Sequence, residues 1–305
     1  MLKSDSSSLR KYARQYPFPT DILIETTTRC NLRCPMCPRH KLDRPKQDMS
    51  FDLWKKIIDQ IVDIDPNTVI WPSILGEPLL LGDDIFRYIG YAKEKGLRKI
   101  CMNTNLAVFD SSLIEPLFSS GVDEVIIGLD SVISETYSRI RIGGDLNTVL
   151  KNIDTIVNEK ARRGSNKPNI TIQYVMQDEN EAEETHFTEY WGKKNWGLTL
   201  KLRYRTSWGG LVEPTHRMVN QKREARDMPC LWLLRQLLIF CNGDVPQCHS
   251  MAEPYFGNVS STPIIEIWNG CLGEIRERHL RKSFDFFPCN QCNDWQCGMS
   301  KTIET

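Results

Sequence analysis

The stretch TRCNLRCPMCPR, residues 28–39, places three cysteines on one short segment directly after a predicted β-strand. That strand is DILIETT, residues 21–27, a short run rich in β-branched residues. The cysteines are Cys30, Cys34 and Cys37, in the spacing CX3CX2C. Three thiolates on one loop can bind three corners of an iron–sulfur cubane and leave one iron open. The spacing is also compatible with zinc, for which His40 is a candidate fourth ligand.

Beyond this motif, short apolar runs alternate with amphipathic stretches as far as residue 205. Further strands are predicted at 68–74, 99–103, 124–130, 169–176 and 198–205. Helices are predicted at 83–96, 113–118, 146–163 and 181–194, and after Ser50 with Leu53, Ile57, Ile61 and Ile64 on one stripe. Six strand–helix units predict an α/β fold, a parallel sheet curled into a partial (β/α)6 barrel. In such folds the site lies at the carboxyl ends of the strands.

The cysteines divide the chain, because seven of the eleven lie between Cys230 and Cys297. The expected organisation is an N-terminal extension (1–20), the barrel (21–205), a polar bridging segment (206–229) and a small Cys-rich domain (230–305). Within the last part, LLIFCNGDVPQC (237–248) predicts a hairpin that turns at Asn242–Gly243, and a helix is expected over 264–282.

Composition excludes several classes of protein. The 305 residues carry 39 Lys+Arg and 39 Asp+Glu, so no global charge favours nucleic acid or an anionic membrane. No apolar run reaches the roughly 18–20 residues that a membrane span needs. The N-terminus has no secretory signal, so a cytoplasmic location is expected. Cytosolic cysteines in spaced groups more often bind metal than form disulfides.

The CX3CX2C segment, and the order of the motifs after it, resembles the radical S-adenosylmethionine (SAM) superfamily. The resemblance implies a [4Fe–4S] cluster held by Cys30, Cys34 and Cys37, with SAM on the open iron. One electron from the cluster would cleave SAM to methionine and a 5′-deoxyadenosyl radical, which takes hydrogen from the substrate. Met36 stands where the family usually has an aromatic residue beside adenine, and its flexible thioether can still pack there.

Other positions match the family's SAM-binding motifs. Gly76 and Glu77, in Gly76-Glu77-Pro78, would receive the SAM amino group through close backbone approach and a carboxylate. The remaining candidates are Asn105, followed by Leu106 where the family often has glycine; Asp130 for ribose or substrate; Arg139 or Arg141 for the SAM carboxylate; and Gln173 near adenine. Taken singly, each fits an ordinary turn, cap or solvated side chain; their order on successive strands carries the resemblance.

The C-terminal part resembles the SPASM and twitch extensions of this superfamily, which hold auxiliary clusters. Cys230, Gly243 and Cys248 fit an opening CX9–15GX4C pattern, and Cys289 and Cys292 form a closing CX2C pair. The resemblance implies one auxiliary [4Fe–4S] cluster on Cys230, Cys248, Cys289 and Cys292, with Cys297 as a possible replacement ligand. A structural zinc site is the alternative, because CX2C pairs are common in zinc proteins.

Two reactions fit a barrel cluster with one auxiliary cluster. In dehydrogenation, the radical takes hydrogen from a carbinol carbon and the auxiliary cluster removes a second electron, as in the twitch-bearing dehydrogenase of aminoglycoside biosynthesis. In epimerisation, a thiol returns hydrogen to the opposite face. The candidate donors are Cys241, Cys271 and Cys297, and Cys241 lies between two proposed ligands. Cys101, in a predicted strand, is expected to be a buried, inert thiol.

The expected substrate is a small molecule of the sugar or aminocyclitol type. Arg203, Tyr204 and Arg205 end the sixth strand and, with Trp208, could bind a sugar ring or an anionic group. A peptide substrate is the alternative, disfavoured because only about twenty residues precede the first strand, too few for a leader-binding domain. The resemblance implies a flavodoxin or ferredoxin as electron donor. A non-catalytic zinc scaffold would not need the three N-terminal cysteines and Glu77 together.

Overall fold

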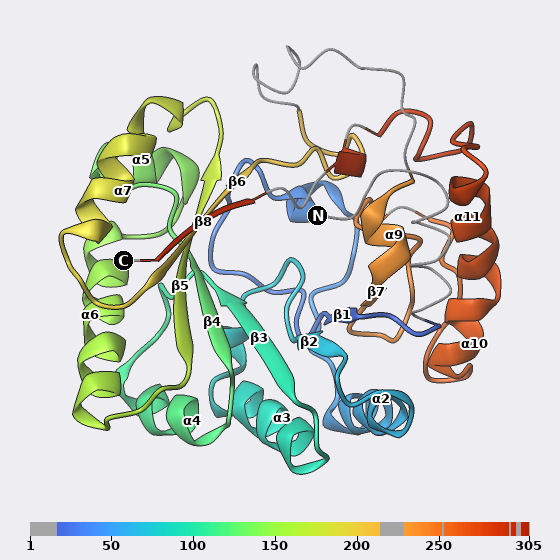
Figure 1. Ribbon diagram of the computed structural model, residues 1–305, viewed down its shortest axis with the longest axis horizontal. Coiled ribbons are helices and arrows are strands. Elements are labelled where there is room, and N and C mark those ends of the chain that lie inside the picture. The colour runs from blue at the N-terminus through green and yellow to red at the C-terminus, as the bar shows by residue number, and fades with distance from the viewer. Residues whose placement is uncertain (1–16, 214–228, 252, 293, 297–299, 305) are drawn as a thin grey trace.

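Six parallel strands form the centre of the fold and pair in the order in which they occur along the chain. They are β1 (Asp21–Ile24), β2 (Val69–Trp71), β3 (Lys99–Thr104), β4 (Glu124–Gly128), β5 (Asn169–Met176) and β6 (Thr199–Tyr204). The structure, a computed structural model, describes residues 17–213, 229–251, 253–292, 294–296 and 300–304. The predicted α/β class with a parallel sheet is confirmed, and the sheet curves with helices along its outer side (Figure 1).

Helices connect the successive strands. They are α2 (Phe51–Ile64), α3 (Asp83–Glu94), α4 (Ile114–Ser119), α5 (Ser134–Ile140), α6 (Leu146–Arg162) and α7 (Glu184–Gly192). Ser50 caps α2 as expected, since its side chain accepts a hydrogen bond from Leu53 N at 3.2 Å. The short α5, between β4 and α6, was not predicted from the sequence.

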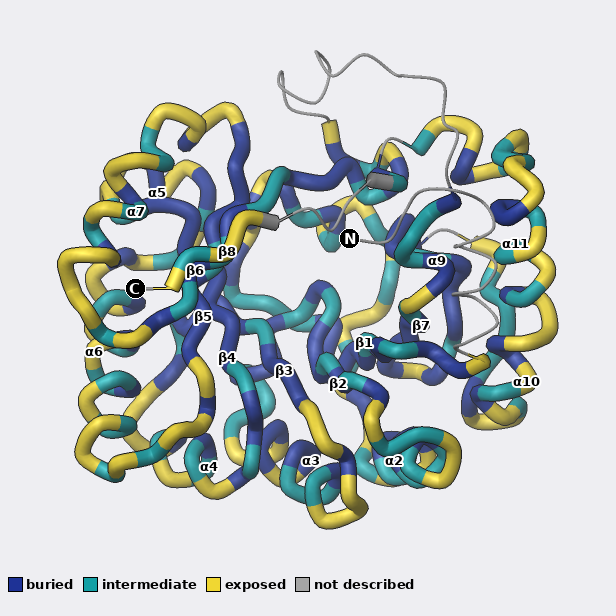
Figure 2. Tube along the Cα trace, viewed as in Figure 1, coloured by how far each residue is buried: buried dark blue, intermediate teal, exposed yellow. Residues whose placement is uncertain are grey.

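The core lies between the sheet and these helices. On α2 the buried side chains are Trp54, Ile57, Ile58 and Ile61. Ile64, expected on the same stripe, is 42% exposed because it is the last residue of the helix. Figure 2 shows the strands largely buried and the outer surfaces of the helices exposed, which is the pattern that amphipathic helices produce on a parallel sheet. No helix in the described ranges is both long enough and apolar enough to span a membrane.

The C-terminal part extends the central sheet at both edges. β7 (Gln236–Ile239) pairs in parallel with β1, and β8 (Ser300–Glu304) pairs antiparallel with β6. The helices of this part are α9 (Leu231–Arg235), α10 (Ile264–Asn269) and α11 (Cys271–Leu280). Residues after 230 therefore complete the same sheet as the barrel strands and do not pack only on themselves.

Two expectations for this part are wrong in detail. The chain does turn at Asn242–Gly243, and Gly243 has a φ of 89°, but β7 pairs with β1 instead of forming a hairpin with the next segment of the chain. The helix expected over 264–282 is two helices, because the backbone at Gly270 leaves the helical region. A Cβ atom at Gly270 would lie 2.7 Å from the Glu266 carbonyl oxygen, so this tight break requires glycine.

Candidate active site

The three N-terminal cysteines lie on the loop that leaves the carboxyl end of β1. A tight turn brings two of them together, since Cys37 N donates to the Cys34 carbonyl oxygen at 3.0 Å. Cys30 Sγ accepts a hydrogen bond from Leu32 N at 3.5 Å. Burial raises the pKa of all three thiols, that of Cys37 to about 11, and each is raised further by the charge of a neighbour. The loop thus gathers three sulfur atoms in a partly buried, apolar setting.

This donor set fits an iron–sulfur cubane. In the described part of the chain, no three Cys, His, Asp or Glu side chains gather closely enough to hold a single metal ion. A cubane binds each thiolate through a different iron, so its ligands stay apart. Thiolate ligands must lose their protons on binding, so iron and nearby cations have to offset the burial that raises their pKa.

Glu77 is buried in the loop after β2 and joins that loop to the end of β3. Its Oε1 accepts hydrogen bonds from Leu79 N (3.1 Å) and Thr104 Oγ1 (2.7 Å), and its Oε2 from Asn105 N (2.7 Å). Burial raises the pKa of Glu77, and these hydrogen bonds oppose the rise. A carboxylate offers about four acceptor positions, so one remains for an ammonium group.

Gly76 allows the loop after β2 to touch the loop after β1. A Cβ atom at this position would lie 1.9 Å from the Thr27 carbonyl oxygen, which is an impossible contact. The next residue, Glu77, donates its N–H to the Arg29 carbonyl oxygen at 2.8 Å. The close contact at Gly76 is therefore with the cysteine loop, and its role toward the SAM amino group stays a prediction.

Asn105 stands at the end of β3 and contacts the cysteine loop. Its Nδ2 donates to Asn31 Oδ1 at 2.9 Å and lies 3.8 Å from Cys30 Sγ. The following Leu106 has a φ of 57°, in the left-handed region that favours glycine. This turn is formed here by a leucine that is 1% exposed.

Asp130 and Arg141 form a buried ion pair beside the cysteine loop, with 2.8 Å between Arg141 Nη2 and Asp130 Oδ2. Arg141 Nη1 also lies 3.9 Å from Cys34 Sγ, and its charge lowers the thiol pKa against the larger effect of burial. Asp130 Oδ1 accepts from Val175 N at 2.8 Å, and burial raises the carboxyl pKa. Gly128 leaves room for the Arg141 guanidinium, because a Cβ atom at this position would lie 2.4 Å from Arg141 Nη2.

The structure separates the two arginines that the sequence left as alternatives. Arg139 is 55% exposed and faces Glu135 on the outer surface of α5, whereas Arg141 points inward. Gln173 pairs with Gly128 across β4 and β5 and is half-buried, whereas Asp130 lies two residues beyond Gly128 and contacts Val175. The sequence order did not indicate that Asp130 and Arg141 would bond to each other.

The four C-terminal cysteines proposed as ligands come together. Besides burial, neighbouring cysteines help to raise two of the thiol pKa values: Cys230 and Cys289 for Cys248, and Cys230 and Cys248 for Cys292. Burial raises the pKa of Cys248 and of Cys292 to about 12. Three of the sulfur atoms accept hydrogen bonds. Ser250 N donates to Cys248 Sγ at 3.4 Å, and Asp294 N donates to Cys292 Sγ at 3.3 Å. Gln247 Nε2 donates to Cys289 Sγ at 3.5 Å. Cys297 lies outside the described residues.

His279 is a site residue that the sequence reasoning missed. It is fully buried on α11, its Nδ1 accepts from Cys230 N at 3.2 Å, and its Nε2 lies 3.2 Å from Cys289 Sγ. Because Nδ1 is an acceptor, the neutral ring carries its proton on Nε2 and donates it to the sulfur. Its only signal in the sequence was a histidine ten residues before Cys289, a proposed ligand.

The other cysteines occupy different surroundings. Cys101 is buried as predicted, and burial raises its pKa to about 12. Cys271 is exposed at the start of α11. Cys241 is 4% exposed after β7, where its sulfur accepts from Gln47 Nε2 at 3.2 Å. Burial and the Glu25 charge raise its pKa to about 12, so it stays a thiol.

The proposed substrate residues lie where β6 meets the C-terminal part. The charge of Arg203 acts on His249, next to Cys248, and burial with this charge lowers the His249 pKa to about 3. Arg205 is 9% exposed and burial lowers its pKa. Trp208 donates its Nε1–H to the Met36 carbonyl oxygen at 3.0 Å, and its ring lies 6.3 Å from that of His249. Trp208 thus lies between the two cysteine groups.

Comparisons with known proteins match both parts of this arrangement. The family model of the radical SAM superfamily matches residues 24–189, more than half of the chain, and the model of the SPASM iron–sulfur cluster-binding domain matches residues 230–297.

Individual relatives differ in what they act on. The chain is 27% identical over 172 residues to the tungsten-containing aldehyde ferredoxin oxidoreductase cofactor-modifying protein of Pyrococcus furiosus, covering 55% of this chain and 47% of that protein. It is 24% identical over 319 residues to the PqqA peptide cyclase of Gluconobacter oxydans, an alignment that covers 91% of this chain and 84% of that protein. Among solved structures, BtrN in complex with AdoMet and 2-DOIA superposes with a TM-score of 0.59 at 15% identity. The superposition covers 91% of this chain and 92% of the BtrN chain.

Proposed function

This chain belongs to the radical SAM superfamily, and we propose on that basis that it dehydrogenates a carbinol carbon of a small, sugar- or aminocyclitol-like molecule. The family implies a [4Fe–4S] cluster with SAM, and the SPASM domain implies auxiliary cluster binding. A cluster with SAM supplies, when bound, reductive cleavage of SAM to methionine and a 5′-deoxyadenosyl radical. In this proposal Cys30, Cys34 and Cys37 hold that cluster.

The chain's own residues position SAM in this proposal. Glu77, with one free acceptor position, binds the amino group, and Asn105 supports the same loop from β3. Arg141 keeps a positive charge beside Cys34, where a carboxylate bound at the cluster would lie. The buried Asp130 holds Arg141 in place, and Gln173 lies on the neighbouring strand opposite Gly128.

The observation that carries the choice of reaction is the second cysteine group. Its thiols influence one another electrostatically, and the sulfur atoms of Cys248, Cys289 and Cys292 receive hydrogen bonds, which fits a fully ligated auxiliary cluster. Dehydrogenation balances with such an acceptor. Removal of the hydrogen atom on the carbinol carbon leaves a hydroxyalkyl radical, which becomes the ketone by losing the hydroxyl proton and one electron. An auxiliary cluster held by the second cysteine group would accept this electron, and Trp208 contacts Met36 beside the first group and packs near His249 beside the second.

The test is product analysis with anaerobically reconstituted protein, reductant, SAM and a panel of sugars and aminocyclitols. A substrate should give one 5′-deoxyadenosine and a ketone two mass units lighter per turnover. Replacing Cys289 and Cys292 by alanine should keep SAM cleavage and stop ketone formation. Ketone formation at the wild-type rate by this variant would contradict the role of the auxiliary group.

Epimerisation is a second candidate, favoured by the Cys241 thiol. Its raised pKa keeps the hydrogen that a donor must give, although Gln47 and Glu25 enclose it. A Cys241→Ala variant would then cleave SAM and lose the epimer, while a dehydrogenase would tolerate the change. Solvent deuterium in the product at the reacting carbon would favour the epimerase.

A peptide substrate is a third candidate, because a relative matched over most of its length is a peptide cyclase. Adding synthetic peptides to the same product screen separates this candidate from a small molecule. The electron donor in either case is proposed to be a flavodoxin or ferredoxin.

A further inference from the structure

A cavity of about 170 Å³ lies beside the cysteine loop, and positive side chains predominate in its lining. The lining contains three cationic side chains, those of Arg39, Arg44 and Lys46. Glu25 is the only carboxylate among the lining residues, so the lining carries a net charge of +2. His40 also lines it; burial and the charge of Arg39 lower the His40 pKa, so the ring adds no charge at neutral pH. The lining is therefore suited to an anion.

Arg44 and Glu25 form the fixed wall of this cavity. The guanidinium binds the carboxylate in a bidentate pair, with Nη1–Oε1 at 3.1 Å and Nη2–Oε2 at 2.5 Å. It also lies over the Phe240 ring at 3.8 Å from the centroid. These contacts use two of the five guanidinium donors and hold the plane rigid, so the remaining donors are pre-oriented.

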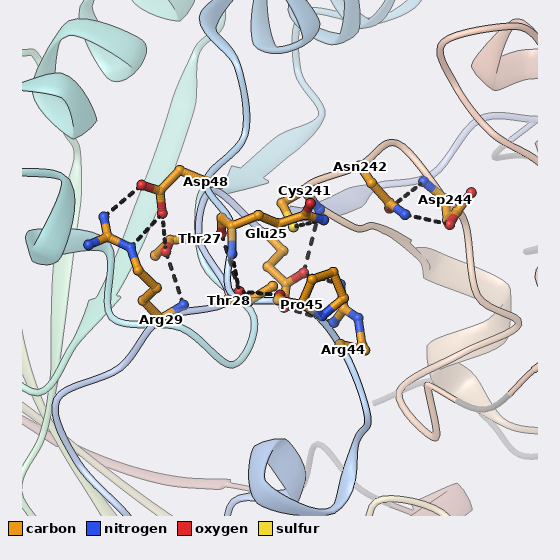
Figure 3. Close-up of polar contacts among 11 residues, drawn as sticks. Glu25, Thr27, Thr28, Arg29, Arg44, Pro45, Asp48, Cys241, Asn242 and Asp244 are labelled. Atoms are coloured by element: carbon orange, nitrogen blue, oxygen red, sulfur yellow. Dashed lines mark hydrogen bonds and ion pairs between the residues drawn. The ribbon is translucent and has the colours of Figure 1, made fainter.

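The segment that carries Arg44 and Lys46 is fastened to the strand end after β1. Met49 N donates to the Thr26 carbonyl oxygen at 2.8 Å, and Thr28 N donates to the Gln47 carbonyl oxygen at 3.0 Å. Figure 3 shows these loops side by side, with Thr28 bonded to Pro45 and Arg44 directed at Glu25. Arg44 and Lys46, two residues apart on this segment, both line the cavity.

Two of the three cations have no carboxylate partner within the described ranges. Arg39 Nη2 donates to the Leu32 carbonyl oxygen at 2.9 Å, and no ion pair is formed by Arg39 or Lys46 among those residues. Arg39 follows the ligand Cys37 by two residues, and Leu75, also in the lining, precedes Gly76. The unpaired charges thus adjoin the loops that hold the cluster and SAM.

We propose that this cavity binds a carboxylate or phosphate group of the substrate and so orients the molecule toward the barrel mouth. The inference rests on the proposed function and narrows its substrate class to acidic molecules. Arg44 and Arg39 supply planar donors, Lys46 supplies a mobile point charge, and charge-assisted hydrogen bonds of this kind are strong.

The test measures binding of inorganic phosphate and, separately, acetate to the reconstituted, SAM-saturated protein by calorimetry. Lys46→Gln and Arg39→Gln should each weaken binding of the preferred anion at least tenfold. Lys41→Gln is the matched control, because Lys41 is exposed on the same turn and does not line the cavity; it should change affinity less than twofold. Whether phosphate or acetate binds more tightly identifies the substrate group.

Three results would overturn the inference: no binding of either anion to the wild type, equal weakening by Lys41→Gln, or an anion affinity that Lys46→Gln and Arg39→Gln leave unchanged. An unchanged phosphate affinity with slower reduction by flavodoxin in Lys46→Gln would reassign the patch to the electron donor. Dithionite-driven 5′-deoxyadenosine formation without substrate is measured in parallel. If 5′-deoxyadenosine still forms but the anions do not bind, only this inference is wrong. If no 5′-deoxyadenosine forms, the proposed function itself is wrong.

Discussion

At the scale of single residues, the imidazole of His279 forms part of the surroundings of Cys289, which we propose as a cluster ligand. It accepts from the Cys230 backbone and donates to the Cys289 sulfur, and it is fully buried. A hydrogen bond to a ligand sulfur stabilises the more negatively charged, reduced cluster. The residue therefore acts through Cys289 and positions it.

We predict that His279→Leu lowers the midpoint potential of the auxiliary cluster, measured by redox titration followed with electron paramagnetic resonance. The free energy of unfolding should fall by about 1–3 kcal/mol because the Cys230 N–H loses its acceptor. His186→Leu, at an exposed position on α7, should change neither quantity much. An unchanged potential in a folded, fully loaded His279→Leu protein would refute the role.

Gly76 and Gly90 offer a matched pair of glycines. Gly76→Ala should destabilise the protein by roughly 1–3 kcal/mol or more and weaken SAM binding, since its Cβ would meet the Thr27 carbonyl. Gly90→Ala, in α3 with no atom within 4 Å of the added Cβ, should stabilise by about 0.5–1 kcal/mol. Denaturant unfolding and SAM calorimetry check both, and equal effects would contradict the packing argument.

At the scale of elements, the ends of β4 and β5 are joined by a buried polar residue, Asn180. Its Nδ2 donates to the carbonyl oxygens of Asp130 (2.8 Å) and Val175 (3.0 Å), and its Oδ1 accepts from Gln177 N (2.9 Å). These bonds satisfy backbone groups that the strand ends leave unpaired. They fix the loop on which Asp130 holds Arg141.

Asn180→Ala should lower the free energy of unfolding by about 2–4 kcal/mol, because several buried backbone groups lose their partners. SAM affinity should fall with it, since Asp130 shifts. Asn158→Ala, which removes an exposed contact with Asp154 on α6, should cost less than about 0.5 kcal/mol. Denaturant unfolding followed by circular dichroism measures the free energy of unfolding of both variants. Similar losses of this free energy in the two variants would contradict the role given to Asn180.

The elements differ in how well the sequence predicts them. The strand over 169–176 is predicted with its observed bounds, because its β-branched run is long and clearly ended. α5 is missed because Ser134–Ile140 is short and carries no clear apolar period. The break at Gly270 is missed because a single glycine in a periodic helix is usually tolerated, and only the contact with Glu266 decides it.

At the scale of the whole molecule, the C-terminal part completes the sheet of the barrel. β7 covers the edge of β1, with Ile22 opposite Leu237, and both side chains are buried. Pairing between strands more than two hundred residues apart has no local signal, so the sequence predicted a hairpin instead. The cysteine ligand sets remain predictions from spacing and resemblance, whereas His279 and the Asp130–Arg141 pair depend on tertiary packing.

A chain that ends at residue 229 should therefore fail to fold cooperatively, because it uncovers the apolar edge of β1. A chain that ends at residue 299 loses only the short, exposed β8 and should remain folded. Size-exclusion chromatography and thermal melts distinguish the two. A monomeric 1–229 chain with the melting temperature of the full protein would show that the parts are independent.

The account as a whole requires that one chain hold two cubanes on two cysteine groups, and the decisive measurement is iron and acid-labile sulfide per chain after anaerobic reconstitution. We expect about eight irons and eight sulfides, falling to about four when Cys30, Cys34 and Cys37 are replaced by alanine. The same loss is expected on replacement of Cys230, Cys248, Cys289 and Cys292. Zinc in place of iron, or four irons that survive loss of the second group, would contradict the account.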